Sequence, residues 1–359
     1  MSDSAPRWGI SFQPILPVPD LARIARAAEV AGASYVFVAD EGTDRDMYVV
    51  MTAVALATSR IVIGAQITNP FSRHPVATAA AFASLEELAP GRIIVGLGVG
   101  GFRVFDPMSI KPARPFTALR ETVEAVDLLL AGEEVTYDGE IHLDRARIPW
   151  SPRRLPILIA GRGPRVEDYA IENADWLLVS GKPIVRLPEL LGRVRSGGPS
   201  RRVPGQARAS VAWSVHVAWT HEMVEAIRPH FTFPAVNMPP DVRALLGIGD
   251  DVADRIREVT VREGWEAASN LVPDSVLKGL AVIGERDSVV EQLDAVRRIA
   301  SPDLLVIPIG DYATAEELIA GVAPIAHAAG FAPADPNFSE PPRSRPLRRL
   351  SQQALEVVR

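Results

Sequence analysis

The chain repeats one pattern along most of its 359 residues: a short apolar stretch, a turn marked by Gly or Asp, and then an amphipathic helix. Strands that alternate with helices form parallel βαβ units, because parallel strands need crossover connections. We count eight strands, over Trp8–Phe12, Tyr35–Ala39, Ile61–Ile67, Arg92–Leu97, Pro156–Ala160, Asp175–Ser180, Ser210–Thr220 and Leu304–Ile309. This count predicts an α/β fold that closes into a (β/α)8 barrel of the TIM type. An open doubly wound sheet would need one or two domains to accommodate the same number of strands and helices.

Eight helices are expected to follow these strands. The first begins near Pro19-Asp20, and the others cover Asp46–Ala57, Pro75–Leu88, Pro115–Leu130, Val166–Asn173, Leu187–Val194, His221–Arg228 and Ala315–Ala329. No linker separates two halves of this series. Residues 1–331 are therefore predicted to form a single barrel domain, followed by a Pro/Arg-rich C-terminal tail over 332–359.

Two insertions interrupt the pattern. Residues 133–155 alternate apolar and polar side chains around Asp138-Gly139, which predicts a hairpin. Residues 230–280 are first Pro-rich and then helical, as in the segment DDVADRIREVTVREG. A long insertion of this kind can cover the mouth of a barrel where substrate enters, or it can be a surface excursion without a role.

The composition excludes several classes of site and partner. The absence of cysteine excludes disulfides, thiolate metal sites and cysteine nucleophiles, and the histidines show no ligand spacing, so we expect no metal. The net charge is 38 minus 44, or −6, which does not favour nucleic acid. No secretory signal or apolar membrane span is visible, and we expect a cytoplasmic protein without a membrane partner.

Active sites of such barrels lie at the carboxyl ends of the strands. Asp40 and Glu41 directly follow the second strand, where a carboxylate can exchange protons with a substrate or accept a hydrogen bond, although either residue could instead cap the next helix. Gln13 ends the first strand. The position at the mouth favours the catalytic interpretation, above all for Asp40.

A glycine-rich loop, AGRGPR, follows the fifth strand and opens a helix. Backbone amides at a helix N-terminus attract anions, and arginine adds positive charge. The candidates for this anion site are Gly161, Arg162, Gly163, Pro164 and Arg165, together with Ser180, Gly181 and Lys182 after the sixth strand. Lys182 is equally consistent with an ordinary solvated lysine.

The third and fourth strands carry the most informative stretch, with TNPFSRHP, then LEELAPGR, then GLGVGG. In this combination the chain resembles the bacterial luciferase-like superfamily, and most closely its F420-dependent branch that includes methylenetetrahydromethanopterin reductase. The resemblance covers nearly the whole chain and is weaker over 133–155 and 230–280.

The resemblance implies that coenzyme F420, or FMN as the alternative, lies across the barrel mouth with its phosphate on the anion loop. It implies a strand bulge behind the ring with a non-prolyl cis peptide bond at Gln66–Ile67. It also places Asn69 near the ring, and Gly98 and Gly100 beside it, where glycine permits close approach. His74, which could also simply start a helix, becomes a proton donor or substrate contact.

The implied activity is hydride transfer between reduced deazaflavin and a small organic substrate, by reduction of a C=O, C=C or C=N bond or the reverse. Asp40, Glu41, His74 and Gln13 are the candidates for proton handling, in that order. Two alternatives stay open: an FMN-dependent monooxygenase on the same barrel, and a barrel that binds flavin without catalysis. By analogy we expect a homodimer. The substrate is not identified by the sequence.

Overall fold

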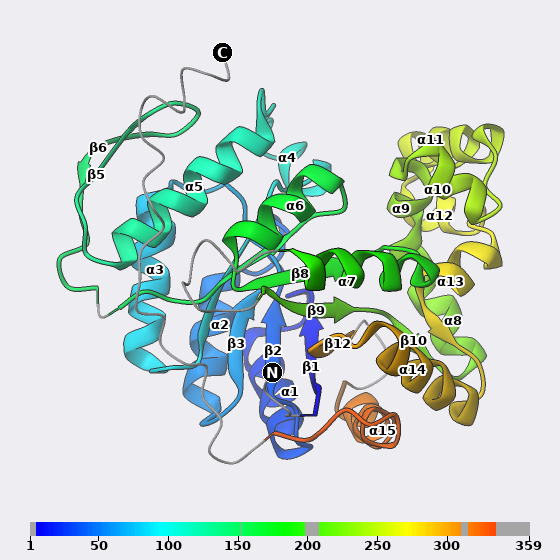
Figure 1. The fold of residues 1–359 in the computed structure, drawn as a ribbon. Coiled ribbons are helices and arrows are strands. Elements are labelled where there is room, and N and C mark those ends of the chain that lie inside the picture. Colours follow the sequence, from blue (N-terminus) through cyan, green and yellow to red (C-terminus); the bar gives the residue numbers. More distant parts are fainter. Residues whose placement is uncertain (1–4, 152, 198–207, 310–314, 335–359) are drawn as a thin grey trace.

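Eight parallel strands form a closed barrel in the computed structural model, which describes residues 5–151, 153–197, 208–309 and 315–334. Around the barrel the order is β1-β12-β9-β8-β7-β4-β3-β2. The bounds are β1 Arg7–Phe12, β2 Tyr35–Val38, β3 Val62–Ala65, β4 Ile93–Gly98, β7 Ile157–Ala160, β8 Trp176–Ser180, β9 Ser210–Ser214 and β12 Leu304–Pro308. The predicted (β/α)8 barrel is confirmed (Figure 1).

Alternation along each strand divides the core into two layers. Tyr35 and Phe37 of β2 face the barrel interior with Trp176 of β8, whereas Val36 and Val38 pack outward against the helices. This alternation follows from the two-residue period of a strand, and it fills the barrel so that it is not an open pore.

The helices that cover the barrel are α1 Val18–Val30, α2 Met47–Ala57, α3 Pro75–Leu88, α5 Pro115–Leu130, α6 Pro164–Asn173, α7 Leu187–Ser196, α14 Arg286–Ala300 and α15 Ala315–Ala328. The short α4 Phe102–Phe105 lies in the loop after β4. Pro75, Pro115 and Pro164 each occupy the first turn of their helix, where proline loses no hydrogen bond.

The predicted seventh strand, Ser210–Thr220, was wrong in its length. Only β9 belongs to the barrel, and β10 Val217–Ala218 pairs instead with β11 Val282–Ile283. The helix expected from His221 also does not cover the barrel: α8 His221–Ile227 opens the insertion, and α14, which the sequence analysis missed, takes that place. The pairing of β10 with β11 joins the two ends of the insertion.

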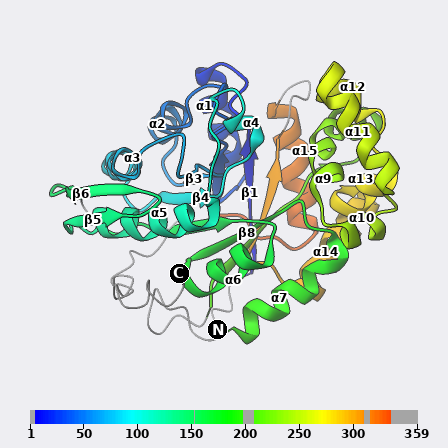
Figure 2. The same ribbon diagram turned by 90° about the horizontal axis from the view of Figure 1, so that it is seen from above.

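The insertion forms a compact group of helices with its own apolar core. It continues through η2 Arg228–Phe231, α9 Thr232–Asn237, α10 Pro240–Leu245, α11 Asp250–Glu263, α12 Trp265–Ser269 and α13 Asp274–Leu280. Its core includes Phe231, Ile256 and Leu277. The expected hairpin is also present, as β5 Val135–Asp138 and β6 His142–Ala146, and Figure 2 shows it at the opposite end of the molecule from the insertion.

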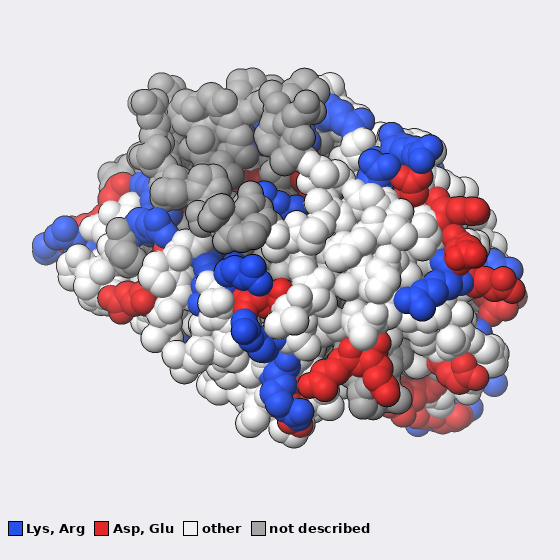
Figure 3. Space-filling model, turned by 90° about the horizontal axis from the view of Figure 1, so that it is seen from below, with Lys and Arg blue, Asp and Glu red and all other residues white. Residues whose placement is uncertain are grey.

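Two further observations concern the surface and the helices. On the face shown in Figure 3, Lys and Arg are interspersed with Asp and Glu around a broad uncharged area. Within the described part of the chain, no helix combines the length and the apolar character that crossing a membrane would require.

Candidate active site

A cavity of about 600 Å³ lies at the carboxyl ends of the barrel strands. Every barrel strand supplies a lining residue at its end or within two residues of it: Phe12, Asp40, Gln66, Gly100, Ala160, Ser180, Ser214 and Pro308. This is where a TIM barrel holds its active site, and the volume suits a small-molecule ligand.

The floor of the cavity is formed by a bulge after β3. The peptide bond Gln66–Ile67 is cis, as predicted, and the strand resumes at Thr68, whose backbone N–H donates to Gly96 O over 3.0 Å. Gly96 has to be glycine here, since a Cβ would lie 1.8 Å from the carbonyl oxygen of Ala65. The bulge brings Gln66 and Ile67 to the bottom of the cavity, which both residues line.

Gly98 of β4 packs against the side chain of Ile67 in this bulge. A Cβ at Gly98 would lie 2.0 Å from Cδ1 of Ile67, so the missing side chain makes room for Ile67. Ile67 lines the cavity, whereas Gly98 does not. Gly98 therefore lies against Ile67 and does not itself face the cavity.

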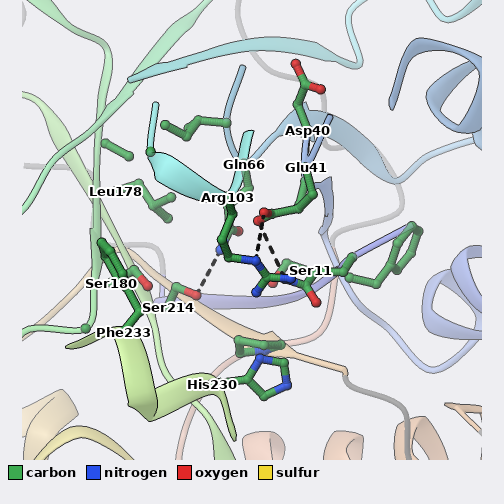
Figure 4. A pocket seen from close by; sticks show the side chains of 18 of the residues that line it. Ser11, Asp40, Glu41, Gln66, Arg103, Leu178, Ser180, Ser214, His230 and Phe233 are labelled. Carbon is green, nitrogen blue, oxygen red and sulfur yellow. Dashed lines mark hydrogen bonds and ion pairs between the residues drawn. The ribbon is translucent and has the colours of Figure 1, made fainter. Parts of the chain in front are cut away.

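The side chain of Gln66 crosses the barrel mouth from β3 to β9. Its Nε2 donates to Ser214 Oγ over 3.1 Å, and Figure 4 shows the two side chains converging. Its Oε1 is buried and has no hydrogen-bond partner among the described residues. A buried unpaired acceptor is costly, so this oxygen suits a ligand that brings a donor.

Asp40 and Glu41 are neighbours in sequence but have different surroundings (Figure 4). The Oδ2 atom of Asp40 accepts a hydrogen bond of 2.7 Å from Thr68 Oγ1, which ties the carboxylate to the end of the bulge. Burial raises the pKa of Asp40, and the hydrogen bond from Thr68 opposes the rise. The carboxylate of Asp40 is therefore hydrogen-bonded to the bulge that forms the floor of the cavity. A proton donor would instead direct its carboxyl group toward the substrate.

Glu41 reaches into the cavity between two polar side chains. Its Oε2 lies 3.7 Å from Nε of Arg103, and its Oε1 lies 3.5 Å from Nε2 of Gln13. Burial raises the pKa of Glu41, and the positive charge of Arg103 opposes the rise. A carboxyl group in this setting can be protonated nearer to neutral pH than an exposed one, which suits a proton donor.

The opposite side of the cavity is the predicted anion loop. Gly161, Arg162, Gly163, Ser180 and Gly181 all line the cavity. A Cβ at Gly163 would meet nothing within 4 Å, so open space lies beside the backbone where α6 begins. These residues were predicted to lie together, and they do share one side of the cavity.

The rest of that predicted anion site faces elsewhere. Pro164, Arg165 and Lys182 do not line the cavity. The guanidinium of Arg165 lies over the ring of Phe116, 4.8 Å from its centroid, and Lys182 Nζ forms an ion pair of 2.7 Å with Oε1 of the buried Glu167. Both cations therefore contact side chains of the surrounding helices, and neither lines the cavity.

The loop after the bulge carries two further residues singled out in the sequence, Asn69 and His74. Asn69 lines the cavity, but its Oδ1 accepts from the backbone N–H groups of Phe71 and Ser72, each at 2.9 Å. His74 is exposed outside the cavity: it caps α3 and its Nε2 lies 3.1 Å from the carbonyl oxygen of His142. Asn69 thus shapes its own loop, and His74 starts a helix, which was the alternative left open above.

Several cavity residues were not predicted. Arg103 comes from α4, His216 from the link between β9 and β10, and His230 and Phe233 from the insertion. The rings of His216 and His230 stack with centroids 4.9 Å apart. Burial lowers the pKa of His216 to about 3, so this imidazole is neutral. Of these residues only Arg103 carried a positional signal, because it lies two residues after the GLGVGG segment at the end of the fourth predicted strand.

Known proteins share this sequence pattern and fold. A family model described as luciferase-like monooxygenase matches residues 6–301. The 5,10-methylenetetrahydromethanopterin reductase of Archaeoglobus fulgidus is 27% identical over 85% of this chain and 94% of its own length. The F420-dependent glucose-6-phosphate dehydrogenase of Nakamurella multipartita is 33% identical, over 50% of this chain and 57% of its own length.

A solved structure extends the likeness to three dimensions. The coenzyme F420-dependent tetrahydromethanopterin reductase from Methanopyrus kandleri superposes with a TM-score of 0.75 at 26% identity, over 89% of this chain and 98% of that one. The similarity therefore covers most of this chain and nearly all of that structure.

Proposed function

Because this chain belongs to the luciferase-like monooxygenase family, we propose that it is an oxidoreductase that transfers a hydride between coenzyme F420 and a small organic substrate. One observation carries the proposal: a single cavity joins a cis-peptide floor to a glycine- and arginine-lined loop. The relatives named as F420-dependent support the deazaflavin over FMN.

The residues present fit a planar ring with an anionic tail. The Gln66–Ile67 bulge offers a backbone surface, and Oε1 of Gln66 offers an acceptor to a ring N–H. Arg162 and the open backbone at Gly163 suit a phosphate, since charge-assisted hydrogen bonds and amides at a helix start both favour anions.

The chemistry would be divided between cofactor and protein. Bound deazaflavin supplies two-electron hydride chemistry. On the protein side, Glu41 holds the proton for the substrate atom that gains negative charge, and Gln13 and Arg103 position its carboxyl group. Apolar lining residues such as Leu21, Ile24 and Ile309 exclude water from the reacting atoms.

The substrate class follows from this arrangement only in outline: a C=O, C=C or C=N bond reduced next to Glu41, or the reverse oxidation. We also propose that the protein is a homodimer and that it is cytoplasmic. The molar mass of the purified protein, measured by light scattering, tests the dimer.

Cofactor binding tests the proposal directly. Fluorescence titration should show that the protein binds coenzyme F420 more tightly than FMN. Arg162→Ala should weaken binding of coenzyme F420 about tenfold, because a charged hydrogen-bond partner of the phosphate is lost. Arg165→Ala is the matched control and should leave the Kd within about twofold, because that guanidinium stacks on Phe116 outside the cavity.

The other outcomes select the alternatives. Tight binding of FMN without binding of coenzyme F420 would favour the FMN-dependent monooxygenase. Binding of coenzyme F420 without turnover of any ketone, enone, imine or alcohol would favour a non-catalytic flavin-binding barrel.

A further inference from the structure

The insertion reaches the proposed anion site through one aromatic side chain. Phe233 belongs to α9, far in sequence from the loop after β7, yet the guanidinium carbon of Arg162 lies 5.3 Å from the centroid of its ring. Phe233 and Arg162 both line the cavity, and Figure 4 shows Phe233 on the same side as Ser180. The barrel and the insertion therefore meet at the arginine that is proposed to hold the phosphate.

Arg162 is contacted from a second side by the end of β8 and the glycine that follows it. Its Nε donates to the carbonyl oxygen of Ser180 over 3.4 Å. Gly181 has a φ of +62°, and a Cβ at that position would lie 3.1 Å from Nε of Arg162. The guanidinium thus lies between a glycine backbone and an aromatic face, in a space that a side chain at position 181 would narrow.

The position of Phe233 is itself fixed by its neighbours in the insertion. His230 stacks on His216, and the ring of Phe231 meets the ring of His216 edge-on with centroids 5.4 Å apart. Phe231 is also buried in the core of the insertion. These contacts hold η2 and the start of α9 against the barrel. The backbone that carries Phe233 is therefore fixed where the ring contacts Arg162.

We propose that Phe233 is a positioning residue of the cofactor site, through which the insertion orients Arg162 for the phosphate of the bound cofactor. The inference rests on the proposed function. A free arginine side chain loses rotamer freedom when it binds an anion, and stacking on an aromatic ring removes that freedom beforehand. Preorganisation of this kind raises affinity without adding a contact to the ligand.

The test is a fluorescence titration of the full-length protein with coenzyme F420. Phe233→Leu keeps an apolar side chain but removes the ring, and should raise the Kd about three- to tenfold. Phe233→Tyr keeps the ring and should restore the wild-type Kd. Val236→Ala, which trims another apolar contact of α9 with the insertion core, should leave the Kd unchanged.

Two further measurements separate positioning from general damage. On an Arg162→Ala background, Phe233→Leu should add no further loss, because the ring then has no guanidinium to orient. The deazaflavin riboside without its phosphate should bind wild type and Phe233→Leu equally. Thermal unfolding of each variant verifies that the fold is retained.

The results distinguish the inference from its premise. If wild type does not bind coenzyme F420, the proposed function fails and the inference with it. If wild type binds but Phe233→Leu binds as tightly, or if Val236→Ala weakens binding as much as Phe233→Leu, the proposed function stands and the role of Phe233 is overturned.

Discussion

At the scale of single residues, the two adjacent carboxyl groups after β2 show how position in the fold separates chemically similar side chains. Asp40 bonds to Thr68 and fixes the end of the bulge, whereas Glu41 extends toward Arg103 and Gln13 inside the cavity. Burial raises the pKa of both groups. Only Glu41 combines that shift with a place among side chains that can contact a substrate, so it is the proton donor that we favour.

Glu41→Gln should lower kcat about 100-fold on the substrate that a panel of ketones, enones and imines identifies, since a positioned proton donor is lost. The wild-type rate should fall as pH rises through the pKa of Glu41, because the donor must be protonated. That fall should occur above the usual range of a glutamate, since burial raises this pKa, and it should be absent in Glu41→Gln. Steady-state kinetics across pH measures both effects.

Asp40→Asn is the control for this experiment. It should retain the pH-dependent fall, because Asp40 contacts Thr68 and is not the proposed donor. A flat pH profile in Asp40→Asn, with the fall preserved in Glu41→Gln, would exchange the two roles.

At the scale of elements, the contact between β3 and β4 is what allows the bulge to lie under the cavity. The backbone of β4 approaches Ala65 so closely at Gly96 that no side chain fits there, and Gly98 leaves room for Ile67. The glycines of the GLGVGG segment therefore serve partly to accommodate a neighbouring strand, and Gly100 alone of the two predicted there lines the cavity.

Gly96→Ala should lower the free energy of unfolding by about 3 kcal/mol or more, because the added methyl group would collide with backbone atoms that cannot move independently. Gly192→Ala is a suitable comparison. This glycine is exposed within α7 and a Cβ there would meet nothing within 4 Å, so alanine should stabilise the protein by about 0.5–1 kcal/mol. Urea unfolding of both variants measures the difference. Equal stability of Gly96→Ala and wild type would contradict the close approach of the strands.

At the scale of the whole molecule, the insertion and the hairpin β5–β6 lie at opposite ends, and only the insertion contributes to the cavity (Figure 2). Among the described lining residues, His230, Phe231, Phe233, Pro234 and Leu280 come from it. The insertion is joined at its base by the β10–β11 pair and seated near its start by the stacked histidines. We therefore expect a ligand in the cavity to stabilise the part of the insertion that lines it.

Binding of coenzyme F420 should slow amide hydrogen exchange in residues 228–237, because a bound ligand stabilises the conformation that contacts it. Residues 135–146 of the hairpin provide the internal reference and should exchange at an unchanged rate. Mass spectrometry of peptides from the two regions makes the comparison. Slower exchange in the hairpin but not in 228–237 would contradict the assignment of the insertion to the site.

The sequence by itself was sufficient for the barrel, because the alternation of apolar strands and amphipathic helices is a local pattern that recurs along the chain. The pattern was insufficient for the seventh unit, whose helix, α14, follows the long insertion. The sequence was also sufficient for the family likeness and for the glycine and arginine loop, since each lies within one continuous motif, and the family likeness in turn implied the cis bond at Gln66–Ile67. These features needed no knowledge of which distant segments meet.

Tertiary structure decided the roles of the individual side chains around the cavity. Lys182 and Arg165 follow the right strands but turn to Glu167 and Phe116, and His74 caps α3. Phe233 reaches Arg162 from an insertion that lies about seventy residues further along the chain, a contact for which the sequence holds no spacing signal. Whether a side chain faces a ligand or a neighbour depends on what the rest of the fold packs beside it, and that information exists only once the chain has closed on itself.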